Sequence, residues 1–115
     1  MLLFVYGSLK KGFWNDFFLK DSKFIGSYQT CKNYGLLINN ELPFMVSFLS
    51  LYPIFGEVYD INDTELKAID NLEGNGKWYT RCEISVKNEV ETIITQAYFN
   101  EDAQGEIQDV GIFYA

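Results

Sequence analysis

The sequence contains no histidine, and this absence removes several kinds of chemistry. A Ser-His-Asp triad or a Cys-His pair cannot operate without an imidazole. Metal sites built on histidine ligands are excluded as well. Any proton transfer near neutral pH must therefore fall to a carboxyl group with a raised pKa, or to a lysine, cysteine or tyrosine.

Cysteine is also scarce, and the two present match no known site pattern. Cys31 and Cys82 are far apart and lack the spacing of a metal or redox motif. We expect both to be small buried hydrophobic residues on strands. With no metal-ligand spacing, we expect the protein to need no cofactor.

Positive charge is limited, and the formal net charge is -7. This balance argues against a nucleic-acid backbone or an anionic membrane as the main partner. A small anionic ligand remains compatible, because a local pocket can oppose the global charge. Lys10 and Lys11 are the nearest positive groups to a Gly-Ser turn, although we expect them to be solvated loop lysines.

Long hydrophobic runs are missing too. The longest apolar stretch, Leu42–Phe55, is interrupted by Pro43 and Pro53 and is shorter than the roughly 20 residues that cross a bilayer. The start of the chain, Met1–Val5, lacks the basic residues of a signal peptide. We therefore expect a cytoplasmic protein with no membrane contact.

The 115 residues suit a single domain over residues 1–115, with 48% hydrophobic residues. Alternation and turn residues predict strands over Leu2–Tyr6, Phe24–Asn33, Tyr34–Ile38, Phe55–Ile61, Tyr79–Lys87 and Thr92–Phe99. The polar segment Asn100–Gly111 is expected to be a loop. The order of strands and helices predicts an α+β domain with a mixed, strongly curved sheet.

Two helices are predicted between these strands. The first carries an aromatic stripe of Phe13, Trp14, Phe17 and Phe18, which we expect to face the core. The second begins at Asn62 with a capping box to Glu65 and ends before Gly74. Its buried stripe is expected to comprise Leu66, Ile69 and Leu72.

The turn Tyr6–Leu9 is the first candidate binding element. It lies between a predicted strand and a helix, and its small residues leave backbone N–H groups without intrachain partners. Such groups can hold a carboxylate or a phosphate. A hairpin turn without function is the competing interpretation of these four residues.

Glu73 is the candidate acid–base residue, and a surface glutamate is the competing interpretation. It ends the second helix, where the helix dipole disfavours a negative charge, and Asp70 lies three residues earlier. Both effects raise the pKa of a carboxyl group, and burial would raise it further. A carboxylate placed against local preference is a candidate general base.

These motifs together resemble the γ-glutamylcyclotransferase-like superfamily, which includes γ-glutamylamine cyclotransferase and AIG2-like proteins. Tyr6–Gly12 is similar to its substrate loop, Ile69–Gly74 followed by Tyr79–Arg81 to its catalytic-glutamate segment, and Phe55–Tyr59 to the preceding strand. The resemblance spans residues 2 to about 99 in the family's order. The segment Glu41–Phe44 departs from the family pattern, so the resemblance does not identify the departing amine.

The resemblance implies a small mixed, mostly antiparallel β-barrel with short flanking helices. It implies that the α-amine of a γ-glutamyl group attacks its own side-chain carbonyl and releases 5-oxoproline and an amine. Glu73 would be the catalytic acid and base. The substrate would be held by residues Tyr6, Gly7, Ser8, Leu9 and Tyr79.

Other roles and functions stay open at this level. Tyr79 could instead pack on the core, Trp78 could line the pocket rim, and Arg81 is expected to form an ion pair with Asp70 or Glu83. A non-catalytic protein that sequesters a small metabolite on the same scaffold is the alternative function. A protein-interaction module has only the acidic loop Glu101–Asp109 in its favour.

Overall fold

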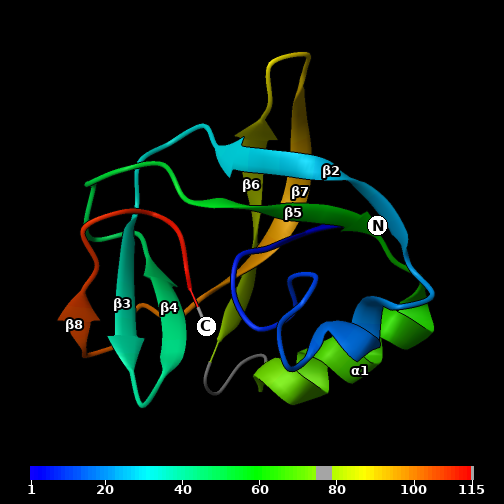
Figure 1. The fold of residues 1–115 in the computed structure, drawn as a ribbon, viewed down its shortest axis with the longest axis horizontal. Coiled ribbons are helices and arrows are strands. Elements are labelled where there is room, and N and C mark those ends of the chain that lie inside the picture. Colours follow the sequence, from blue (N-terminus) through cyan, green and yellow to red (C-terminus); the bar gives the residue numbers. More distant parts are fainter. Residues whose placement is uncertain (75–78, 115) are drawn as a thin grey trace.

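Strand β1 (Leu2–Val5) closes a five-stranded β-barrel in the computed structural model, which describes residues 1–74 and 79–114 (Figure 1). The barrel order is β1-β5-β2-β6-β7, with β2 at Lys23–Thr30, β5 at Phe55–Asp60, β6 at Thr80–Lys87 and β7 at Thr92–Phe99. Neighbouring strands are antiparallel except for β1 and β7, which pair in parallel. The predicted α+β class and mixed barrel are confirmed. Trp78 lies outside the described residues.

A second, three-stranded sheet lies beside the barrel, at the left of Figure 1. Its order is β4-β3-β8, with β3 at Gly35–Asn39, β4 at Leu42–Val46 and β8 at Glu106–Ile107. The prediction of a loop throughout Asn100–Gly111 is therefore wrong in part. The two residues of β8 pair with β3, and a strand of only two residues leaves no alternating pattern in the sequence.

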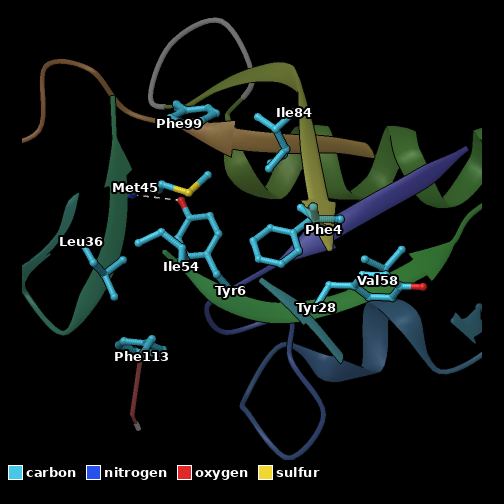
Figure 2. Packing of buried hydrophobic residues seen from close by; sticks show 12 residues of the cluster. Phe4, Tyr6, Tyr28, Leu36, Met45, Ile54, Val58, Ile84, Phe99 and Phe113 are labelled. Carbon is cyan, nitrogen blue, oxygen red and sulfur yellow. Dashed lines mark hydrogen bonds between the residues drawn. The ribbon is translucent and has the colours of Figure 1, made fainter. Parts of the chain in front are cut away.

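Alternation along β1 divides the core into two clusters. Phe4 points into the barrel cluster, which Figure 2 shows reaching Met45 on β4 and Phe113 near the end of the chain. Leu3 and Val5 point the other way and pack with Ile69 of the helix. Strand β1 is thus buried on both faces. The Tyr6–Leu9 turn follows its C-terminal end and lies between the two clusters.

Helix α1 (Asp63–Glu73) has the predicted ends. The Asn62 side chain accepts from the Glu65 N–H, and the Glu65 carboxylate accepts from the Asn62 N–H, which completes the capping box. Gly74 adopts the left-handed conformation at φ 61° that a C-terminal glycine supplies. Of the predicted stripe, Ile69 is buried, but Leu72 is 40% exposed and faces a surface cavity.

The predicted aromatic helix does not form. The chain makes turns from Gly7 and then a single 3₁₀ segment, η1 (Asp16–Leu19), packed beside α1. Trp14 and Phe17 are 49% and 56% exposed. Four residues of 3₁₀ helix cannot turn all four rings toward one side, and Gly12 at φ 90° breaks the preceding backbone.

The expectation that both cysteines are buried is also wrong. Cys31 and Cys82 are exposed free thiols. Cys31 lies just past the end of β2, and Cys82 lies on β6 before Ile84, the first buried residue of that strand. The alternating pattern does not reveal where the barrel core stops. Within residues 1–74 and 79–114, no helix is long and apolar enough to cross a membrane.

Candidate active site

A narrow inner cavity opens where β1 ends. It brings together all six residues predicted for the site, which are Tyr6, Gly7, Ser8, Leu9, Glu73 and Tyr79. The rest of its lining comprises Phe4, Val5, Pro43 and Tyr98. Its volume of about 30 Å³ gives room for about two waters or one carboxylate group. The cavity thus has the size of a small anionic head group.

Local hydrogen bonds fix the Tyr6–Leu9 turn with its amides free. The Gly7 carbonyl accepts from the Lys10 N–H at 3.1 Å, and the Ser8 carbonyl accepts from the Asn15 N–H at 3.0 Å. Among the described residues, the N–H groups of Gly7, Ser8 and Leu9 donate to no protein acceptor. Three successive unpaired donors beside a small cavity form an anion-binding arrangement.

The segment after the turn is anchored on both sides. The Lys10 ammonium donates to the Phe113 carbonyl at 2.9 Å and lies over the Phe13 ring, while the Lys11 N–H donates to the Glu57 carboxylate at 2.8 Å. Lys10 is only 9% exposed, so the expectation of a solvated lysine is wrong for it. Burial lowers the pKa of the Lys10 amine, and the nearby Glu57 charge opposes this effect. Lys11 is exposed, as predicted.

Glu73 projects from the last turn of α1 into this cavity. Burial raises the pKa of its carboxyl group to about 7. No hydrogen bond from another described residue reaches the carboxylate. The pKa shift has the direction expected from the sequence, but its cause is burial and not the repulsion expected from Asp70. Asp70 is instead held by Arg81 at 3.1 Å, the ion pair that was predicted, and by the Tyr98 hydroxyl.

Three tyrosines surround the Glu73 carboxyl, and burial raises the pKa of each phenol, with a smaller contribution from the Glu73 charge. The Tyr6 hydroxyl donates to the Tyr98 carbonyl at 2.7 Å and accepts from the Met45 N–H, the dashed bond in Figure 2. The Tyr79 hydroxyl donates to the Pro43 carbonyl at 2.8 Å. The phenol hydroxyls are therefore held by hydrogen bonds within the protein, and their raised pKa values keep them neutral around the Glu73 carboxylate.

A second, wider cavity begins on the other side of Glu73 and Tyr79, which line both spaces. Its volume is about 680 Å³, within the range of small-molecule sites. Its lining includes the apolar side chains of Leu42, Phe44 and Leu72 and several amides, among them Asn15, Asn71 and Asn100. The site is thus a small inner compartment and a large outer one with an ionisable carboxyl group at their boundary.

This arrangement can bind a carboxylate and transfer a proton next to it. Within the part of the chain that the structure describes, no three cysteine or acidic side chains gather as metal ligands would. Asn15, Pro43 and Tyr98 were not expected at the site from the sequence. Asn15 lies between the aromatic residues on which the prediction of a helix was based. Pro43 and Tyr98 reach the site only because β4 and β7 fold beside it.

Comparison with known proteins decides the family. The model of the family described as gamma-glutamyl cyclotransferase, AIG2-like, matches residues 3–111. The chain belongs to the AIG2-like gamma-glutamyl cyclotransferase family. This membership confirms the family resemblance and the prediction of an enzyme of the γ-glutamylcyclotransferase type.

Relatives within the AIG2-like family are found in archaea and animals. A Methanocaldococcus jannaschii protein that carries the name gamma-glutamylcyclotransferase is 45% identical over 85 residues, which is 73% of this chain and 70% of the relative. Gamma-glutamylaminecyclotransferase B of Danio rerio is 35% identical over 108 residues, which is 84% of this chain but only 56% of the fish protein. The chain is thus considerably shorter than the animal relative.

Solved structures show the same fold. An AIG2-like protein from Mus musculus superimposes with a TM-score of 0.81 at 23% identity, covering 90% of this chain and 78% of the mouse protein. A Pyrococcus horikoshii protein gives a TM-score of 0.80 at 24% identity, covering 98% of this chain and 89% of its own. The barrel with its added sheet is therefore the architecture of AIG2-like proteins.

Proposed function

We propose that this protein releases 5-oxoproline and a free amine from a γ-glutamyl compound. The α-amine of the glutamyl group attacks its own γ-carbonyl carbon, the new C–N bond closes the five-membered ring, and the original amide C–N bond breaks. Glu73 takes two protons in turn, one from the α-ammonium before the attack and one from the ring nitrogen after it, and passes each to the departing nitrogen, so that the amine leaves as an ammonium ion. The step is balanced without an added reactant.

The observation that carries this proposal is the position of Glu73 between the two compartments. In a γ-glutamyl compound the α-carboxylate and the α-ammonium are on one carbon, and the scissile amide is three carbons away. With the carboxylate on the N–H groups of Gly7, Ser8 and Leu9, the ammonium lies next to the inner cavity and Glu73. The departing amine then occupies the outer cavity.

The environment of Glu73 suits the chemistry. A carboxyl group with a pKa of about 7 is poised to accept and donate a proton near neutral pH. General acid–base catalysis of this kind contributes roughly 10²–10⁴-fold to the rate. Holding the flexible glutamyl chain in a cyclising conformation adds a proximity term.

A panel assay tests the reaction and separates it from metabolite sequestration. The purified protein is incubated with γ-glutamyl amines and γ-glutamyl dipeptides, and released 5-oxoproline is quantified by chromatography and mass spectrometry. We expect multiple turnovers on at least one γ-glutamyl amine. Tight binding of a panel member without any 5-oxoproline would instead support the sequestering function.

The acid limb of the pH profile gives a second prediction. Below a pH of about 7 the Glu73 carboxyl is protonated and cannot accept a proton, so kcat/KM should fall as the pH drops through this value. Initial rates between pH 5 and 8.5 at subsaturating substrate measure the limb. A kcat/KM that stays constant down to pH 5 would contradict this prediction. It would show that the rate depends on a carboxyl group of ordinary pKa, or on no carboxyl group at all.

A further inference from the structure

Asn15 makes two hydrogen bonds to a single residue of the substrate turn. Its backbone N–H donates to the Ser8 carbonyl at 3.0 Å, and its side-chain Nδ2 donates to the Ser8 hydroxyl oxygen at 2.9 Å. The two residues are seven positions apart, and the intervening loop is tied down by Lys10 and Lys11. Asn15 therefore clamps both the backbone and the side chain of Ser8.

The direction of the side-chain bond fixes the role of the Ser8 hydroxyl. An amide nitrogen only donates, so the Ser8 oxygen is the acceptor and its own proton is free to point elsewhere. Ser8 lines the inner cavity, and its hydroxyl donates to no other described residue. The proton is thus available to a group inside the cavity, next to the N–H groups of Gly7, Ser8 and Leu9.

We propose that Asn15 is a positioning residue that turns the Ser8 hydroxyl into a fourth donor for the carboxylate of the ligand. The identity of that ligand, a γ-glutamyl compound, rests on the proposed function. Asn15 acts through Ser8 and not by contact with the carboxylate. Its effect must therefore disappear when the Ser8 hydroxyl is removed.

A double-mutant cycle measures this dependence directly. The probe is 5-oxoproline, which carries the carboxylate in question, titrated by calorimetry into the wild type, Ser8→Ala, Asn15→Ala and the double variant. Since a hydrogen bond to a charged group is worth about 1.5–3 kcal/mol, each single change should raise Kd at least tenfold. The double variant should lie within about twofold of Ser8→Ala, because the two losses are one interaction.

Asn15→Asp tests the direction of the bond. A carboxylate cannot donate to Ser8, so it would accept the hydroxyl proton and turn it away from the cavity. We expect this near-isosteric variant to bind 5-oxoproline more weakly than Asn15→Ala. Affinity equal to the wild type would mean that Ser8 already donates to Asn15, which contradicts the proposal.

Two further variants separate positioning from folding. Asp16→Ala removes a bond to the same loop, from the Gly12 N–H at 3.0 Å, without touching Ser8, and should leave Kd unchanged within about twofold. Ser8→Thr keeps a hydroxyl and should retain near wild-type affinity. With a substrate from the panel, Asn15→Ala should raise KM and leave kcat nearly unchanged, because the carboxylate contact is made before and during reaction.

The outcomes distinguish this inference from the proposed function. If the wild type binds 5-oxoproline but Asn15→Ala and Ser8→Ala bind it equally well, the positioning role is wrong while the proposed reaction stands. Additive losses in the double variant would likewise show that Asn15 does not act through Ser8. If the wild type shows no saturable binding of 5-oxoproline, the turn does not hold its carboxylate and the positioning role falls, while turnover in the panel assay decides the proposed reaction separately.

Discussion

Replacing Glu73 with glutamine should abolish release of 5-oxoproline while the fold is retained. Glutamine has nearly the same shape but cannot accept the proton of the α-ammonium or return one to the amine. General acid–base catalysis contributes roughly 10²–10⁴-fold, and turnover should drop by at least that factor because this carboxyl supplies both transfers. The comparison uses kcat/KM for the best substrate of the panel.

The same substitution should stabilise the protein above neutral pH. The folded-state pKa of about 7 lies above the ordinary value of 4.5, so the ionised carboxylate opposes folding. This cost is absent below pH 4.5, grows as the pH rises to about 7 and then stays constant, at up to about 3 kcal/mol. Glutamine is neutral throughout, so denaturant unfolding at pH 8 should show the gain and at pH 4 should not.

Glu83→Gln is the matched control, because Glu83 is an exposed glutamate on β6 that lines neither compartment. It should leave turnover unchanged. Undiminished release of 5-oxoproline by Glu73→Gln would refute the proposed mechanism. Loss of turnover with no pH-dependent gain in stability would show that the Glu73 carboxyl is not buried as described.

Gly7→Val should eliminate binding of 5-oxoproline and of γ-glutamyl substrates. A Cβ atom on Gly7 would lie 2.7 Å from Cγ of Pro43, well inside van der Waals contact. The proline ring cannot rotate away, so the turn and β4 must separate and the N–H donors lose their alignment. We expect at least a hundredfold rise in Kd, the equivalent of losing about two charge-assisted hydrogen bonds.

Calorimetric titration with 5-oxoproline measures this effect, and circular dichroism checks the fold. A paired substitution gives the control: Gly7→Ala should weaken binding, and adding Pro43→Ala should recover much of it by removing the Cγ atom that the new methyl group meets. Wild-type affinity in Gly7→Val would place the anion site away from this turn.

The local elements were predictable where the sequence contains complete signals. Asn62, Glu65 and Gly74 specify both ends of α1, and strand β7 falls on Thr92–Phe99 as its alternation predicts. The signals failed where few residues decide the structure. The ring pattern at Phe13–Phe18 resembles a helix, but the folded loop is held by contacts to Glu57 and Phe113 that no local pattern contains.

The sequence indicated some of the residues that line the candidate site, but not how they are organised. The family resemblance and the unpaired N–H groups expected in the turn pointed to Tyr6–Leu9, Glu73 and Tyr79. The structure places these residues around one cavity. Sequence alone could not show that the Tyr98 hydroxyl of β7 also binds Asp70, whose ion pair with Arg81 was one of two pairings expected. It also could not show that Asn15 reaches back to Ser8. Long-range packing decides both.

The buried carboxyl of Glu73 has a practical consequence in a chain without histidine. Imidazole groups ordinarily dominate the buffering capacity of a protein near neutrality, and here that background is absent. Protons exchanged between the side chains and solvent around pH 7 report chiefly on the Glu73 carboxyl group. Calorimetry of ligand binding in buffers of different ionisation enthalpy therefore counts the protons that Glu73 gains or loses, without any label.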